Sequence, residues 1–195
     1  MTRRRPVLAP ATVTTLFARR SRVTPLSAAL VCTLAFAQPA TAQGNGSGYP
    51  RVRSTNALIA TAIEQASERS ATFHRLIDTI NASLGTVYVE QGKCRYGFRA
   101  CLVTVTMAGA HRYLWVTVDT RMAEWDLMGS IGHELQHAIE VLSDRTVTSS
   151  FAMYYFYLGE GSHSIGLAFE TEAAIEAGEA VRAEVREYRA PAQAR

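Results

Sequence analysis

Residues 128–142 read MGSIGHELQHAIEVL, and this stretch carries the clearest helical pattern in the chain. At about 100° per residue, its apolar side chains fall on one face of a helix that begins near Ala123. That face holds Met128, Ile131, Leu135, Ala138, Ile139 and Leu142. The opposite face holds His133, His137 and Glu140. The pattern predicts a helix that is anchored by its apolar face and presents its histidines at the floor of a cleft.

Within this helix, residues 133–137 read HELQH. Two histidines four residues apart lie about one turn from each other on the same face, so both imidazoles can reach a single tetrahedral Zn²⁺. Glu134, between them, stays free to activate a water molecule. The motif therefore predicts a metal site with His133 and His137 as ligands and a general base beside them.

Catalytic zinc usually takes three protein ligands, so a third His, Asp or Glu is expected elsewhere. A last helix is expected over residues 168–188, with Glu170 on its apolar face. The other members of that face are Ala173, Ala174, Ala177 and Val181. A lone carboxylate on such a face is costly to bury unless a metal or a buried arginine pairs with it. Glu170 is the expected third ligand, with Glu172 as the substitute if the phase of the helix differs.

HELQH followed by a glutamate 33 residues after His137 resembles the gluzincin type of zinc metallopeptidase. The chain is also similar to exported bacterial proteins that carry HELQH and a downstream FETxAA segment. The resemblance covers roughly residues 125–181. Ala174 stands where the best-known gluzincins have an aspartate four residues after the glutamate. Glu140 and Ser143 stand where the metzincin extension needs glycine and histidine.

The resemblance implies a zinc-dependent peptidase with Zn²⁺ as cofactor and a peptide or protein as substrate. Glu134 would be the general base, taking a proton from water and later delivering it to the leaving amine. Glu140 would hold a ligand imidazole through a hydrogen bond, or else be an exposed residue at the edge of the cleft. The candidates for stabilising an oxyanion are His163, Tyr154, Tyr155 and Tyr157, with core packing or a loop position as the alternative.

Two other functions remain open at this stage. One is a non-catalytic periplasmic protein that keeps a metal for structure or binding, and the other is an exported interaction domain in which HELQH is accidental. Glu134 favours the enzyme, because a purely structural site gains nothing from a carboxylate next to its ligands.

The first 42 residues have the features of a secretory signal. They contain six arginines and no acidic residue, an apolar stretch over residues 26–36 and the small residues Ala-Thr-Ala at 40–42. An uncleaved membrane anchor is the alternative, but an apolar run of about 11 residues is short for a bilayer. We expect a signal peptide over 1–42, a flexible mature N-terminus over 43–53 and one zincin-like domain over 54–190.

Charge and cysteine content fit an exported protein that is periplasmic or secreted. Beyond residue 42 the chain has 14 basic and 17 acidic residues, so it has no electrostatic reason to bind nucleic acid. Cys94 and Cys101 form an even pair that can turn back at Gly97, and in an oxidising compartment a disulfide is expected. A loop this short would stabilise the fold by about 2 to 3 kcal/mol. Two unpaired buried thiols are the alternative.

The remaining patterns predict an α+β fold. Length and composition, 195 residues with 48% hydrophobic and 19% charged, suit one globular domain. Helical spacing over 58–66, with a cap expected at 54–56, and over 73–80 indicates one bent helix or two short ones, and 86–90 is typical of a strand. Apolar, β-branched runs over 102–107 and 112–118 predict a hairpin. We expect a zincin-like arrangement: a small antiparallel sheet with the hairpin packed beside the HExxH helix, and further helices around it.

Overall fold

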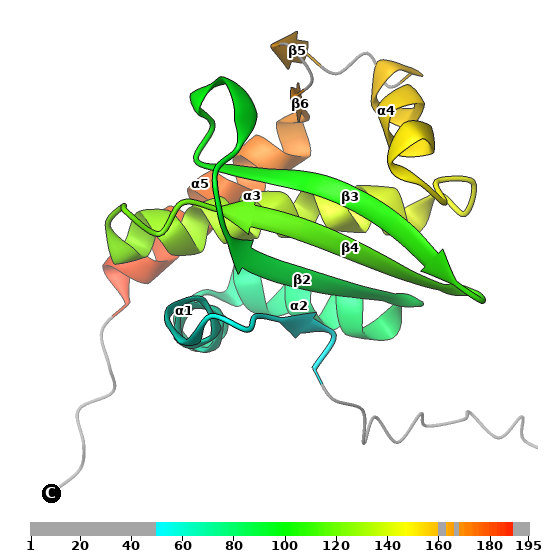
Figure 1. Ribbon diagram of the computed structural model, residues 1–195. Helices are drawn as coiled ribbons and strands as arrows, with labels where there is room; N and C mark the ends of the chain where they lie inside the picture. Colours follow the sequence, from blue (N-terminus) through cyan, green and yellow to red (C-terminus); the bar gives the residue numbers. More distant parts are fainter. Residues whose placement is uncertain (1–49, 160–162, 166–167, 189–195) are drawn as a thin grey trace, which may run out of the picture. The chain divides into compact units, whose positions relative to one another are not determined.

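The computed structural model describes residues 50–159, 163–165 and 168–188 (Figure 1). The expected signal peptide and most of the expected flexible N-terminus lie outside these residues. Among the residues described, no helix combines the length and the apolar character needed to cross a membrane.

A four-stranded sheet lies on one side of the fold, with the helices behind it in Figure 1. Its strands are β1 (Val52–Arg53), β2 (Gly85–Gln91), β3 (Ala100–Ala108) and β4 (His111–Val118), in the order β1-β2-β4-β3. The α+β class and the β3–β4 hairpin are confirmed. The sheet is mixed rather than wholly antiparallel, because the chain passes from β2 to the outer edge as β3 and returns as β4, parallel to β2.

Strand β1 corrects one boundary. The sequence predicted a flexible segment over 43–53, but Val52 and Arg53 pair in parallel with Val87 and Tyr88 of β2. Val52 is only 4% exposed, and burial of its apolar side chain accounts for the order of this segment. The folded domain therefore begins slightly before residue 54.

The first helical region is two helices, α1 (Ala57–Arg69) and α2 (Ala71–Ala82). The side chain of Asn56 caps α1, as expected for the 54–56 segment, by accepting from the N–H groups of Leu58 and Ile59. Ser70 has an extended backbone and ends α1, and its hydroxyl accepts from the N–H of Phe73 to cap α2. One serine therefore ends α1 and begins α2.

The hydroxyl of Ser70 also donates to the carboxylate of Glu184 on α5 (Glu172–Glu187), at 2.6 Å. The same carboxylate accepts from the N–H and the hydroxyl of Thr72, at 2.9 and 2.7 Å. A carboxylate at the N-terminus of α2 accepts from donors that have no partner within the helix, and its negative charge interacts favourably with the helix dipole. Partial burial raises the pKa of Glu184, but these hydrogen bonds outweigh it and hold the pKa below its ordinary value.

Replacing Glu184 by Gln is expected to lower the free energy of unfolding at pH 7 by about 1 kcal/mol, because a charged acceptor is lost in a partly exposed place. A depressed folded pKa contributes stability above the unfolded pKa and loses it on acidification. The difference between wild type and E184Q should therefore shrink as the pH falls from 7 through about 4. Urea unfolding at several pH values measures it, with the exposed Glu187→Gln as control. A difference that grows on acidification would contradict this role.

Helix α3 (Glu124–Ser143) lies between the sheet and α5, so both of its sides are covered. Its close approach to α5 depends on glycines. A Cβ at Gly129 would lie 2.2 Å from Cγ of Arg182, and one at Gly178 of α5 would lie 3.0 Å from Cβ of His133. The predicted apolar face of α3 is confirmed as core. Its histidine face is covered by α5 and by the segments before α5 rather than open to solvent.

The structure of residues 168–188 differs from the single helix that the sequence predicted there. Residues Ala168–Glu170 form strand β6, which pairs antiparallel with β5 (His163–Ile165). Helix α5 begins only at Glu172, because Thr171 is extended and caps it by accepting from the N–H of Ala174. Glu170 is therefore on a strand and not on a helix. The aromatic cluster before it forms helix α4 (Ser150–Gly159), which lies against β3.

Candidate metal centre

Three side chains from two distant parts of the chain meet beside α3. One ligand atom from each of His133, His137 and Glu170 lies within 4.8 Å of the other two. Nε2 of His133 is 3.2 Å from Oε2 of Glu170. Two nitrogens and one carboxylate oxygen at these separations form a group that could hold a metal ion. The sequence named these three residues, although the strand position of Glu170 was not foreseen.

The two ring nitrogens of His137 have different surroundings. Nδ1 lies 2.9 Å from Oε2 of Glu140, whereas Nε2 is buried and has no hydrogen-bond partner among the described residues. A carboxylate at Nδ1 favours the tautomer in which Nε2 carries a lone pair. A buried acceptor without a partner is costly, and a metal ion is a partner that removes this cost. The donor set and this nitrogen therefore fit a metal.

Glu140 is itself held by two other elements. Its Oε1 accepts from the hydroxyl of Thr171 at 2.7 Å, and its Oε2 accepts from the hydroxyl of Tyr157 at 3.2 Å. Burial raises the pKa of Glu140, but hydrogen bonds from His137, Thr171 and Tyr157 outweigh it and lower the pKa. An ionised Glu140 thus orients the His137 ring, as expected for a carboxylate behind a metal-binding imidazole.

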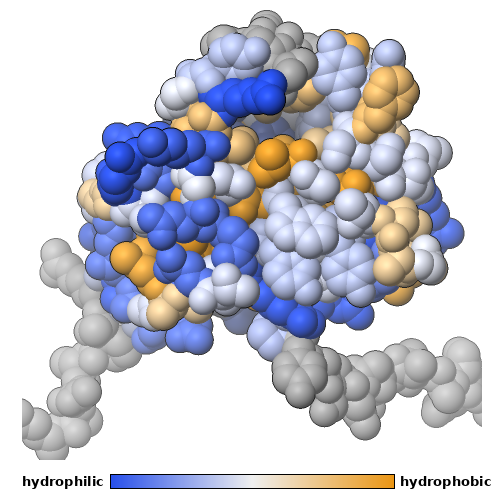
Figure 2. Space-filling view, viewed as in Figure 1, coloured by the Kyte–Doolittle hydropathy of each residue, from blue (hydrophilic) through white to orange (hydrophobic). Residues whose placement is uncertain are grey.

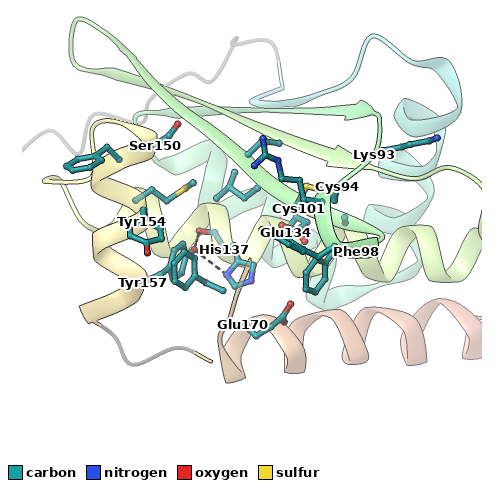
Figure 3. A pocket seen from close by; sticks show the side chains of 18 residues that line it. Lys93, Cys94, Phe98, Cys101, Glu134, His137, Ser150, Tyr154, Tyr157 and Glu170 are labelled. Atoms are coloured by element: carbon teal, nitrogen blue, oxygen red, sulfur yellow. Dashed lines mark hydrogen bonds between the residues drawn. A yellow bond between two sulfur atoms is a disulfide. The ribbon is translucent and has the colours of Figure 1, made fainter. Parts of the chain in front are cut away.

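Tyr157 completes this arrangement from α4. Its hydroxyl lies 3.2 Å from Nδ1 of His137 and donates to the His137 carbonyl at 3.1 Å, as well as to Glu140. Burial and the charge of Glu140 raise the pKa of Tyr157. The phenol therefore stays protonated and remains a donor, and Figure 3 shows it beside the imidazole.

Glu134 is the second carboxylate on α3 and has a different environment. It is 4% exposed, and burial raises the pKa of its carboxyl group against the opposing effect of the nearby histidines. The backbone N–H of Leu102 on β3 is its hydrogen-bonding neighbour. The β3–β4 register shifts between Leu102 and Thr104, which makes Val103 an extra residue at this point of the edge strand. A buried carboxylate with a raised pKa next to a metal site has the properties of a proton acceptor.

The imidazole of His133 is paired with Glu170 in the same group. Burial disfavours its charged form, but the hydrogen bond to Glu170 and the charge of Glu134 outweigh burial and raise the pKa of His133. The same hydrogen bond lowers the pKa of Glu170. The side chain of Glu170 is 30% exposed, so one edge of the group opens toward solvent.

Several other candidates are not part of the group. Glu172 is exposed in the first turn of α5 and does not belong to the three-residue cluster. His163 pairs with Glu170 through the β5–β6 backbone register, and its side chain lies outside the described residues.

Tyr155 is 56% exposed, and Tyr154 packs its ring edge against Phe169 at 5.5 Å. Tyr157 alone of the three tyrosines contacts the centre directly.

A cavity of about 630 Å³ lies beside the group, with Glu134, His137 and Glu170 in its wall (Figure 3). The loop between β2 and β3 closes one side, where the predicted disulfide between Cys94 and Cys101 is confirmed. Gly97 in this loop has a positive φ of 78° and makes the expected reversal. An accessible cavity bordered by a buried carboxylate and by atoms that could hold a metal is a place where a small ligand can meet both.

Two contributors were missed in the sequence. Thr171 had a signal, because a threonine before a helical run is typical of an N-cap, and the capping position would also have separated Glu170 from the helix. No sequence pattern indicates the Leu102 N–H, since its position next to Glu134 depends on how β3 lies across α3. No family model matches the chain, and searches of curated proteins and of solved structures found no similar protein.

Proposed function

We propose that the chain is an exported zinc-dependent peptidase that hydrolyses peptide bonds with Glu134 as general base. The observation that carries this proposal is Nε2 of His137, which is buried without a described partner and belongs to the cluster with His133 and Glu170. Two imidazole nitrogens and one carboxylate form a common donor set of catalytic zinc, which leaves a fourth position for water or substrate.

A zinc ion held by these residues would supply Lewis-acid polarisation of the scissile carbonyl and lower the pKa of water. Glu134 then accepts a proton from the attacking water at one carboxylate oxygen. The water oxygen bonds to the carbonyl carbon, the C–N bond breaks, and the proton held by Glu134 passes to the leaving nitrogen. Burial supports this role, because Glu134 is 4% exposed and lies in the wall of the cavity beside the cluster.

Glu140, Tyr157 and Thr171 are positioning residues in this proposal. They fix the His137 ring through Nδ1 and the backbone carbonyl and keep Nε2 directed into the cluster. Tyr157 was also a candidate for stabilising an oxyanion. Its contacts with His137 and Glu140 favour the positioning role, since they engage the hydroxyl on the Nδ1 side of the ring.

Export is supported by the confirmed disulfide, which is consistent with an oxidising compartment outside the cytoplasm. The signal peptide expected over 1–42 remains part of the proposal. A periplasmic or secreted peptidase would meet peptide or protein substrates there. Beyond residue 42 the chain has 17 acidic and 14 basic residues, which gives it no electrostatic reason to bind nucleic acid.

Replacing Glu170 by Ala is expected to weaken zinc binding about 100-fold or more, since even the loss of outer contacts to ligands costs 10- to 100-fold. Glu172→Ala is the matched control, because Glu172 is two residues away and exposed, and its zinc affinity should equal that of wild type. Zinc competition titration with a chromophoric chelator measures both. Full zinc affinity in E170A would remove Glu170 from the site, and a wild-type chain that binds no zinc would end the proposed function.

A further inference from the structure

The cavity beside the metal centre has walls of distinct character (Figure 3). Apart from Glu134, His137 and Glu170, most of its lining is apolar or aromatic. The apolar wall comes from the β2–β3 loop, β3, α4 and β6: Phe98, Leu102, Val103, Met153, Tyr154 and Phe169. A cavity of about 630 Å³ lies within the range of small-ligand sites and is large enough for an aromatic side chain with its neighbouring peptide group.

The β-bulge in β3 contributes directly to this wall. Leu102 and the extra residue Val103 both line the cavity, although neighbouring residues of a regular strand point to opposite faces. Val103 is 48% exposed, and Phe151 of α4, which also lines the cavity, is 71% exposed. These apolar surfaces are open to solvent in the free protein, so an apolar ligand that covers them gains the hydrophobic contribution. Figure 2 shows apolar surface next to hydrophilic side chains on the upper part of the sheet face.

The lining of the cavity includes two cationic side chains. Lys93 and Arg95 are exposed and line it, and neither forms an ion pair within 4.0 Å with any residue that the structure describes. Among the described residues of the lining, the only acidic ones are Glu134 and Glu170, which belong to the candidate metal centre. The disulfide between Cys94 and Cys101 closes the loop that carries Arg95 and thereby limits the positions of this charge.

We propose that this cavity selects peptides that place a large apolar or aromatic side chain against the α4–β3 wall and a carboxylate near Lys93 and Arg95. The carboxylate is either the C-terminus of the peptide or an acidic side chain next to the apolar residue. This substrate class rests on the proposed peptidase function. The specificity residues are Val103 for the apolar wall and the pair Lys93 and Arg95 for the anion.

The test measures binding separately from hydrolysis. Calorimetry with zinc-loaded, full-length E134Q would use acetyl-Ala-Ala-Phe as free acid, the same peptide as amide, and acetyl-Ala-Ala-Ala as free acid. A fourth and a fifth peptide, both amidated, carry Glu or Ala after Phe. The Phe acid should bind at least about tenfold more tightly than the Ala acid. At low salt, the affinity of the Phe acid should exceed that of the Phe amide by about three- to tenfold, or the affinity of the Phe-Glu peptide should exceed that of the Phe-Ala peptide by the same factor.

Two pairs of variants assign these effects to residues. In K93A/R95A the preference for the carboxylate should disappear, whereas Arg99→Ala, which removes a cation of the same loop outside the cavity lining, should keep it. Val103→Asp should weaken binding of the Phe acid about tenfold, whereas Met107→Asp, also exposed on β3 but outside the lining, should not. Equal binding of Phe and Ala peptides, or an unchanged carboxylate preference in K93A/R95A, would overturn the inference.

Hydrolysis of the same peptides by wild type keeps the two proposals distinguishable. Selective binding to E134Q with no cleavage by zinc-loaded wild type would support the ligand class and reject the peptidase. Cleavage of all peptides at equal rates would support the peptidase and reject the selectivity. The pair of peptides with the larger difference in affinity shows whether the preferred carboxylate is a C-terminus or an acidic side chain.

Discussion

Glu134→Gln is expected to lower peptide hydrolysis about 10²- to 10⁴-fold while zinc stays bound, because it removes the proton acceptor and leaves the ligands in place. The amide of Gln has nearly the shape of the carboxylate and can still accept from the N–H of Leu102. Initial rates of cleavage, followed by mass spectrometry on a peptide that wild type cleaves, measure the effect. Zinc content is determined on the same samples.

Urea unfolding of the same variant tests whether a loss of activity reflects a loss of stability. The folded pKa of Glu134 is raised, so in the metal-free protein at pH 7 its charge opposes folding. In the presence of a chelator, E134Q should therefore unfold at the same urea concentration as wild type or a higher one. Glu176→Gln, on the exposed face of α5, should leave both activity and stability unchanged. Activity that survives in E134Q would exclude Glu134 as the base.

Arg112→Met is expected to lower the free energy of unfolding by about 3 to 5 kcal/mol. Arg112 is 7% exposed, and its guanidinium lies at the C-terminal end of α3, beyond His137 and Glu140. It donates from Nη1 to the carbonyls of Val141, Asp144 and Val147 and from Nη2 to the carbonyl of Leu142. Burial lowers the pKa of Arg112, yet the cation remains charged and satisfies the last carbonyls of the helix. Methionine fills the volume but leaves these acceptors without a donor.

Urea unfolding of the metal-free chain measures this loss. Arg145→Met is the matched control, because Arg145 is exposed near the same helix end, and its change should stay within about 0.5 kcal/mol. Arg112→Lys should fall between wild type and Met, since lysine keeps the charge but cannot donate to several carbonyls in the fixed geometry of a guanidinium. An R112M chain as stable as wild type would mean that solvent, not Arg112, satisfies the end of α3.

Much of the fold followed from local patterns. The β-branched and aromatic run of β4 and the 3.6-residue period of α3 identified both elements. The period of α3 also identified most of its buried apolar residues, because it decides which side chains share a face. The N-cap at Asn56 and the turn at Gly97 followed from side-chain and backbone preferences within a few residues. The parallel pairing of β2 with β4 did not follow, because strand order depends on contacts between segments far apart in the chain.

The prediction of Glu170 reached the right residue through a wrong local structure. Its helical phase suggested an inward carboxylate, but Thr171 begins the helix one residue later and Glu170 is inward because β6 pairs with β5. Thr171, which follows the strand and caps α5, meets Glu140. Residue type, an acidic side chain among apolar neighbours, carried more information than the assumed period.

The sequence by itself determined the two histidines, the glutamate between them and the disulfide partners, since these depend on spacing along one helix or one short loop. Only the tertiary structure decided the third member of the cluster, the Glu140–Tyr157–Thr171 support of His137 and the cavity with its two cationic lining residues. Each of these joins segments that are not adjacent in sequence, and their meeting is set by how α3, α4, β3 and α5 pack. HELQH thus specifies which atoms can bind a metal, and the packing around α3 specifies what surrounds them.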